Sequence, residues 1–381
     1  MKHRKTLFVS IASLLIFLLF LRFYFLVKDS SMLDPLDVFV GVDVAYDNLA
    51  DIKRLVDEVR SYTNLFVVGS TGITFNITKL DEVCQYIYDS GLYFIVYTHP
   101  TEDIPQTQWV EDARQRWGNR FLGLYAYDEP GGHQIDCDRP YMLVEEADNY
   151  TDAANKYVEL LDGNLKHFTE YYMCVGDFPL FTSDYALYWF DYKAGYDVLL
   201  AQFGWNYSRQ LNVAFCRGAA TFQNKSWGAI ITWTYNDPPY IESGEELYND
   251  MVLAYENGAK YIVVFDSNKN YTQGILEEEH LEALKQFLQY VQDNPRTSET
   301  IIDRVAYVLP KDYAYGFRGP NDKIWGLWEA DAFSYELCVS LNNLMEQYGT
   351  KLDIIYDDGL ELSKAYGYSK LIFWNGTCMQ Q

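Results

Sequence analysis

Basic residues are scarce in this chain of 381 residues, in which 30 Lys and Arg stand against 54 Asp and Glu. The resulting formal net charge of −24 creates a field that repels polyanions. We therefore expect no nucleic-acid partner and no attraction to anionic lipid headgroups, whereas neutral or cationic ligands stay open.

Sequence patterns for common cofactors and metals are also missing. No GxGxxG follows the first predicted strand, residues 38–44, so a dinucleotide site has no support. The six cysteines form neither CxxC nor a zinc spacing, and whether they pair in disulfides stays open. Metal-dependent amidohydrolase barrels carry His-x-His on strand one, where this chain has Val-Asp-Val. A metal site built from Asp43, His99 and Asp266 is therefore the least favoured hypothesis, and we expect no metal and no cofactor.

A long apolar run stands near the start of the chain. Residues 7–27 contain one charge, Arg22, and follow the basic cluster MKHRK. That length spans about 30 Å of hydrocarbon, and it exceeds the apolar core of a signal peptide. We expect residues 1–30 to be an uncleaved transmembrane signal-anchor, with a cleaved signal as the alternative. The basic flank predicts a single-pass protein whose bulk lies on the extracytoplasmic side. Six N-x-S/T motifs fit an extracellular glycoprotein.

Apolar runs and amphipathic stretches then alternate regularly. Continuous apolar runs are typical of buried parallel strands. Eight strand units within about 255 residues match the usual size of a closed barrel. We therefore predict an α/β fold, a (β/α)8 TIM barrel over residues 36–295, with an open doubly wound sheet as the alternative. The predicted strands are 38–44, 64–68, 92–97, 121–127, 180–182, 197–202, 227–234 and 260–266, and the predicted helices are 49–61, 78–90, 106–117, 152–172, 209–222, 244–257 and 277–293.

The alternation restarts after Pro295 on a smaller scale. Strands are predicted at 304–309, 352–356 and 370–374, with a helix at 332–347. We expect residues 296–381 to form a small C-terminal α/β domain. The chain ends soon after its last apolar strand, which leaves one edge of this sheet without an explanation.

The stretch 121–133, FLGLYAYDEPGGH, runs from a buried strand into two carboxylates, Asp128 and Glu129. Barrel enzymes place their chemistry at the carboxyl ends of strands, so this stretch is the first candidate for a site. Side chains alternate along a strand, which predicts that Asp128 and Glu129 point to opposite sides, with Tyr127 on the side of Glu129. Pro130 predicts an extended backbone at Glu129.

Acids and aromatic residues follow several other predicted strands. Glycoside hydrolysis needs one carboxylic acid to protonate the leaving oxygen and a second carboxylate to attack carbon or activate water. Aromatic rings suit the faces of sugars. The catalytic candidates are Glu129, Asp237 and Glu242. The candidates for substrate binding are Asp43, His99, Asp128, Tyr127, Trp205, Trp233, Tyr235 and Asp266.

The motif Asp128-Glu129-Pro130 resembles the Asn-Glu-Pro of the large clan of (β/α)8 glycoside hydrolases that carry their acid/base glutamate after strand four. The resemblance implies a barrel fold, a carbohydrate substrate and a proton-donating Glu129. It also implies a glutamate nucleophile at the end of strand seven, where residues 233–235 read Trp-Thr-Tyr. Asp237 and Glu242 are the nearest acids, and this departure favours an inverting over a retaining mechanism.

Two functions are therefore weighed for the same cleft. The first is a membrane-anchored extracytoplasmic glycoside hydrolase acting on glycans. The alternative is a non-catalytic barrel that binds glycans or scaffolds the cell envelope, and the chain also resembles membrane-anchored barrel proteins of uncharacterised activity. The two differ in whether Glu129 has a second inward carboxylate within reach, because a shared fold by itself says nothing about activity.

Overall fold

The computed structural model describes residues 37–98, 106–172, 178–296, 304–358 and 367–380. The apolar run at 7–27 and the candidate His99 lie outside these residues. Among the helices of the described residues, none combines the length and the apolar character needed to cross a membrane.

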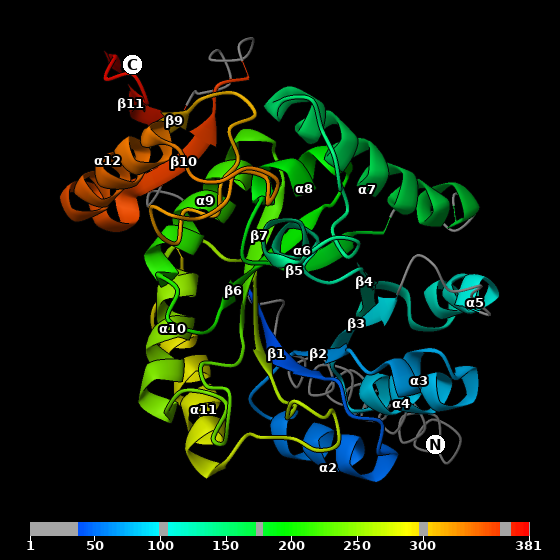
Figure 1. Ribbon diagram of the computed structural model, residues 1–381. Helices are drawn as coiled ribbons and strands as arrows, with labels where there is room; N and C mark the ends of the chain where they lie inside the picture. Colours follow the sequence, from blue (N-terminus) through cyan, green and yellow to red (C-terminus); the bar gives the residue numbers. More distant parts are fainter. Residues whose placement is uncertain (1–36, 99–105, 173–177, 297–303, 359–366, 381) are drawn as a thin grey trace, which may run out of the picture. The chain divides into compact units, whose positions relative to one another are not determined.

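Eight parallel strands close into a barrel in sequence order, so the (β/α)8 prediction is confirmed and the open-sheet alternative is wrong (Figure 1). Each strand pairs with its neighbours in the chain, and β8 pairs with β1 through Phe39 and Tyr261. The strands are β1 Phe39–Val44, β2 Leu65–Val68, β3 Tyr93–Thr98, β4 Phe121–Ala126, β5 Leu180–Asp184, β6 Val198–Phe203, β7 Ser226–Ile231 and β8 Tyr261–Phe265.

Helices follow most of the strands and begin at ordinary caps. Ser208 and Ser243, for example, accept hydrogen bonds from the backbone N–H groups of Leu211 and Glu246. Three short helices, α3, α6 and α8, were not expected from the sequence. The helices of the barrel are α2 Leu49–Val59, α3 Thr71–Thr74, α4 Ile77–Asp89, α5 Gln106–Trp117, α6 Pro130–Asp136, α7 Tyr150–Tyr172, α8 Tyr188–Ala194, α9 Arg209–Phe222, α10 Gly244–Glu256 and α11 Glu278–Asp293.

The barrel interior is filled by every second side chain of the strands. Leu65 and Val67 of β2, for example, join Val198 and Leu200 of β6 in one buried apolar cluster. The alternation continues to the carboxyl ends of the strands. There the next inward position on β6 is Gln202, so the strands present polar side chains at the barrel mouth.

The C-terminal residues form the small α/β sheet that the sequence predicted. Its strands are β9 Arg304–Leu309, β10 Leu352–Tyr356, β11 Tyr368–Phe373 and β12 Cys378–Gln380, and its helix is α12 Ala332–Tyr348. The strand order is β10-β9-β11-β12. The antiparallel β12 covers the edge of β11 that the sequence left unexplained.

The sheet packs directly on helix α9 of the barrel (Figure 1). Close approach requires a glycine, because a Cβ at position 218 in place of the hydrogen of Gly218 would clash with the backbone oxygen of Ile354. Residues Val38–Gln381 accordingly form one compact unit, in which the barrel and the second sheet share an interface.

Candidate active site

A cleft with a cavity volume of about 560 Å³ opens at the carboxyl ends of the barrel strands. Its described walls come from the ends of β1, β3, β4, β5, β6, β7 and β8 and from segments that follow the strands, including Gly69 and Thr71 after β2. Three carboxylates, Asp43, Asp128 and Glu129, line it. All three belong to the set that the sequence singled out.

Asp128 and Glu129 both face this cleft, so the expectation that they point to opposite sides is wrong. Strand β4 ends at Ala126, before the alternation reaches them. The backbone is left-handed at Tyr127, with φ 62°, and at Glu129, with φ 51°. Glu129 is therefore not extended, and Pro130 begins helix α6 directly after it. A left-handed residue costs roughly 1–2 kcal/mol, and such strain collects at functional sites.

A hydrogen-bond chain fixes the two carboxylates. The Gln202 side chain donates from Nε2 to Glu129 Oε1 at 2.6 Å and to Ser183 Oγ at 2.8 Å. Ser183 Oγ in turn donates to Asp128 Oδ1 at 2.8 Å, and the Tyr125 hydroxyl donates to the same oxygen. Neighbouring strands thus hold the acids of the β4 loop in one arrangement, which is what a preorganised site requires.

The carboxyls of this cleft resist ionisation. Burial and the nearby charge of Asp128 raise the pKa of Glu129 to about 8. Burial, and again Asp128, raise the pKa of Asp43 well above its ordinary value. Asp43 is 3% exposed, and its Oδ1 has no hydrogen-bond partner among the described residues. Like charges that lie close together disfavour full ionisation, so this arrangement favours the retention of protons on carboxyls of the cleft.

A fourth acid, Asp184 at the end of β5, supports the site from outside the cleft. Its carboxylate accepts hydrogen bonds from the backbone N–H groups of Gly131, at 2.5 Å, and Gly132, at 3.0 Å, at the start of α6. It also accepts from Tyr185 N and Ala186 N. Asp184 therefore ties the start of α6, and with it Glu129, to the end of β5.

Aromatic rings form much of the remaining wall. Trp233 lies close to Tyr271, with ring centroids 6.1 Å apart and planes 30° apart. The Lys269 ammonium lies 5.5 Å from the ring centroid of Trp205 and 6.0 Å from that of Trp233. Trp205 and Trp233 line the cleft as the sequence-based assignment requires. Flat aromatic faces of this kind are suited to sugar rings.

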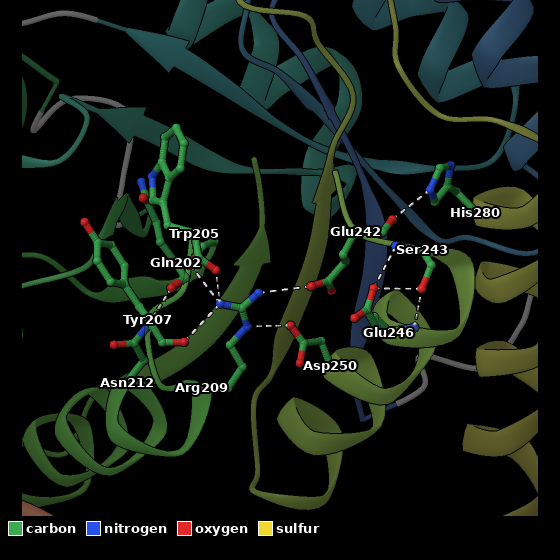
Figure 2. A network of polar contacts seen from close by, with 11 residues as sticks. Gln202, Trp205, Tyr207, Arg209, Asn212, Glu242, Ser243, Glu246, Asp250 and His280 are labelled. Carbon is green, nitrogen blue, oxygen red and sulfur yellow. Dashed lines mark hydrogen bonds and ion pairs between the residues drawn. The ribbon is translucent and has the colours of Figure 1, made fainter. Parts of the chain in front are cut away.

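Arg209 holds the loop between β6 and α9, which carries Trp205 and Tyr207 into the cleft (Figure 2). Its Nη1 donates to the backbone oxygens of Gly204, Trp205 and Tyr207, at 2.8, 3.1 and 3.1 Å. Figure 2 shows the same guanidinium facing Glu242, at 3.0 Å, and Asp250, at 2.8 Å, on its other side. We call this arrangement the Arg209 clamp.

The clamp explains why Glu242 is absent from the cleft: its carboxylate is engaged with Arg209 behind the loop. Asp237 is exposed in a turn, where its backbone oxygen accepts from Tyr240 N, and it does not line the cleft either. Asp43 lines the cleft with Glu129 in place of the two partners that the sequence suggested.

Three candidates for substrate binding also lie outside the cleft lining. Asp266 holds the loop after β8, because its Oδ1 accepts from the backbone N–H groups of Ile275 and Leu276. Tyr235 is 46% exposed on the outer loop. The Tyr127 hydroxyl forms a hydrogen bond with His133 Nδ1 at 3.2 Å. His133 lines the cleft, and Tyr127 lies behind it.

Comparisons with known proteins establish the fold. No protein-family model matches the chain, and no curated protein matches its sequence. A beta-galactosidase from the psychrophilic Marinomonas ef1 superimposes with a TM-score of 0.58 at 11% identity, covering 88% of this chain and 72% of that one. A GH5_18 protein from Bifidobacterium longum subsp. infantis gives 0.55 at 9% identity, covering 90% and 98%. The alpha-L-fucosidase isoenzyme 2 from Paenibacillus thiaminolyticus gives 0.54 at 9% identity, and the match covers 87% of this chain and 59% of that protein. The resemblance to barrel glycoside hydrolases is therefore confirmed for the fold.

The position after β7 departs from that clan in the structure as it does in the sequence. Thr232 and Trp233 line the cleft there, and neither carries a carboxylate.

Several lining residues were missed by sequence reasoning. Gln202, Ser183 and Tyr97 were within its reach, because each lies two residues beyond an inward apolar position on its strand. Tyr185, Tyr207 and Tyr271 come from loops, whose course no periodicity describes, and His133 comes from the short helix α6, which the sequence did not predict.

Proposed function

We propose that this protein is a glycoside hydrolase and that Glu129 donates the proton to the glycosidic oxygen. The observation that carries the proposal is the carboxylate cluster of Asp43, Asp128 and Glu129 inside an aromatic cleft at the catalytic end of a barrel. The cleft is acidic and the chain is strongly anionic, so the substrate class is a neutral or cationic glycan.

Each carboxyl has a distinct role in this proposal. Glu129 carries a proton near neutral pH because its pKa is raised to about 8, and Gln202 fixes Oε1. Burial raises the pKa of Asp128, but the hydrogen bonds from Tyr125 and Ser183 favour its ionised form, and that negative charge favours the protonated form of Glu129. Asp43 is the second carboxyl: when ionised, it deprotonates water or stabilises positive charge at the sugar carbon as the bond to the leaving oxygen breaks.

The experiment compares wild type with Glu129→Gln on a natural glycan and on an activated aryl glycoside. Gln keeps the shape but loses the proton, and general acid catalysis is worth about a hundred- to ten-thousand-fold. We expect a loss of that size on the natural glycan and a smaller loss on the aryl glycoside, whose leaving group hardly needs protonation. Asp237→Asn, an exposed acid outside the cleft, is the matched control and should retain activity. Equal cleavage of the natural glycan by wild type and Glu129→Gln contradicts the assignment.

A non-catalytic glycan-binding barrel is the second candidate, and one observation favours it. The residues after β7 supply no carboxylate to the described cleft lining, although barrel hydrolases of the resembled clan carry theirs there. If wild type and Glu129→Gln bind the same glycans on an array and neither cleaves any, the binding function replaces the enzymatic one.

We further propose that residues 7–27 anchor the protein in a membrane with its bulk on the extracytoplasmic side. The length of this apolar run and the basic residues before it support the proposal. An anchored barrel of this kind would meet glycans of the cell envelope or of the surroundings.

A further inference from the structure

A second cavity lies beside the cleft, at the junction of the barrel with the C-terminal residues. We call it the side pocket, and its volume is about 170 Å³. The barrel supplies one wall from the loop after β6 and from α9, including Asn206 and Leu211. The C-terminal residues supply the opposite wall, including Phe317 and Tyr356. Asn206 is exposed, so the pocket opens to solvent at this rim.

The side pocket and the cleft share a wall. Tyr185 and Tyr207 line both cavities, and their rings lie 5.7 Å apart with planes 30° apart. Arg318 holds this wall: its Nη1 and Nη2 donate to both carboxylate oxygens of Asp136, at 2.6 and 2.7 Å. Asp136 Oδ2 also accepts from the Tyr185 hydroxyl at 2.9 Å, and Tyr207 accepts from Arg318 at 3.4 Å. A ligand that extends over these two rings therefore contacts both cavities.

The lining of the side pocket defines the class of ligand. Half of its lining residues are aromatic, Trp189 and Phe215 among them, and Asn206 and Asn212 add amide groups. Arg318 is the one charged residue among its described lining residues, and Asp136 and Asp322 already engage its guanidinium. An anion would therefore find no unpaired cation among these residues. A cavity of about 150 Å³ accommodates one benzene ring, so this volume suits one six-membered ring.

We infer that the side pocket binds one uncharged pyranose unit of the same glycan that occupies the cleft. The inference rests on the proposed function, and it assigns to the C-terminal residues a part in substrate selection. Glycans with a branch or an extension that crosses Tyr185 and Tyr207 would gain contacts that a disaccharide confined to the cleft does not make.

The test fills the side pocket in the full-length protein purified in detergent. Leu211→Trp fills it from α9, and Leu211→Met is the volume-conserving control. Asn206→Trp covers the exposed rim without changing the core. Asn206→Gln is its control, because both substitutions remove the N-x-S/T glycosylation motif formed by residues 206–208. Affinities are measured by calorimetry for neutral disaccharides and for larger linear and branched neutral oligosaccharides. Methyl glycosides of neutral monosaccharides are added as the smallest probes, followed by saturation-transfer NMR.

We expect both Trp variants to weaken binding of the larger oligosaccharides by about tenfold or more, and to leave disaccharide affinity within about twofold. Methyl glycoside signals that disappear in Leu211→Trp and persist in Trp233→Ala would place a sugar in the side pocket even if no glycan is cleaved. If Glu129→Gln abolishes cleavage while neither Trp variant changes any affinity, the proposed function stands and this inference is overturned. If wild type binds no sugar of any size, both are overturned.

Discussion

Glu129 is held by its backbone and by its neighbours at once. Its left-handed conformation turns the side chain into the cleft, and Gln202 then fixes one of its two oxygens. Burial and Asp128 favour the protonated form, while Gln202 opposes them by stabilising the charge. The balance raises the pKa to about 8, which suits a group that must give up a proton near neutral pH.

The pH profile tests this balance. A general acid works in its protonated form, so kcat/KM should fall as the pH rises through about 8. Asp128→Asn removes the charge that raises the pKa of Glu129, so this falling limb should move to lower pH. The measurement is kcat/KM against pH on a natural glycan, with Asp237→Asn as the variant whose limb should stay in place. A limb unmoved by Asp128→Asn would mean that another group titrates there.

The same shift has a consequence for stability that needs no substrate. The folded protein holds the Glu129 proton up to a pH of about 8, whereas an unperturbed Glu releases it near 4.5. Between these values the folded state binds more protons than the unfolded state, so the contribution of Glu129 to stability falls as the pH rises. The free energy of unfolding of Glu129→Gln should therefore rise relative to wild type across this window.

At the scale of elements, the loop between β6 and α9 shows how a site is supported from behind. Trp205 adopts a left-handed backbone with φ 48°. This conformation is strained, so it persists only where the surrounding structure holds the loop in place. Arg209 binds three backbone oxygens of this loop, and Glu242 and Asp250 balance its charge. A planar guanidinium can serve five acceptors in fixed directions, whereas an ammonium is a point charge.

Arg209→Lys should therefore loosen the loop while keeping a positive charge between the two acids. We expect weaker glycan binding with most of the stability retained. Arg209→Met leaves both acids without their partner and should cost about 3 kcal/mol of unfolding free energy. Glycan affinity and the denaturant midpoint are measured side by side.

Glu242→Gln distinguishes a role in the clamp from the catalytic role that the sequence suggested for Glu242. Gln still offers Arg209 an oxygen, so activity should stay within a few-fold of wild type if Glu242 only supports the loop. A catalytic Glu242 would instead lose activity by about a hundred-fold or more.

At the scale of the whole molecule, helix α9 links the barrel to the second sheet. Arg217 on this helix reaches Asp353 of β10 at 2.6 Å, and the two side chains are 4% and 0% exposed. Its Nη2 also donates to the backbone oxygens of Thr350 and Leu352. The side pocket lies along the same junction, so its shape depends on the two parts staying docked.

Arg217→Met should cost about 3–5 kcal/mol, because it leaves the buried Asp353 without its closest partner. Arg304→Met is the matched control, since Arg304 meets the same carboxylate at 3.3 Å and is more exposed. Chemical unfolding of both variants gives the comparison. Equal losses of unfolding free energy in the two variants would mean that the contact of Arg217 with Asp353 stabilises the protein no more than the ion pair between Arg304 and Asp353.

The anchor is a further prediction for the whole molecule. Deleting residues 1–28 should move the protein from the membrane fraction to the soluble fraction, because the deletion removes the apolar run. Fractionation of the full-length and shortened chains provides the measurement. A mature N-terminus found downstream of Val27 would replace the anchor with a cleaved signal.

The eight barrel strands, the longer helices and the second sheet follow the order predicted from the sequence, whereas α3, α6, α8 and β12 were not predicted. Hydrophobic periodicity is a local property, and a parallel strand buried on both faces is apolar wherever the chain goes next. The ends of β9 and β10 and of helices α5 and α9 agree with the predicted ranges residue for residue. Positions at strand ends also made candidates of five residues that line the cleft, Asp43, Asp128, Glu129, Trp205 and Trp233.

The tertiary structure alone decided which of these side chains meet. Asp128 and Glu129 face the same cleft because the backbone is left-handed at Tyr127 and Glu129, just after β4 ends. Hydrophobic periodicity does not predict such a turn. Asp266 directly follows β8, yet the backbone of the loop after β8 engages its carboxylate. Glu242 lies farther along the chain, just before α10, and its carboxylate is engaged by Arg209. The side pocket joins residues about a hundred positions apart, such as Leu211 and Phe317. Contacts of that kind depend on how the loops and the second sheet pack, which is a property of the folded chain and not of any one segment.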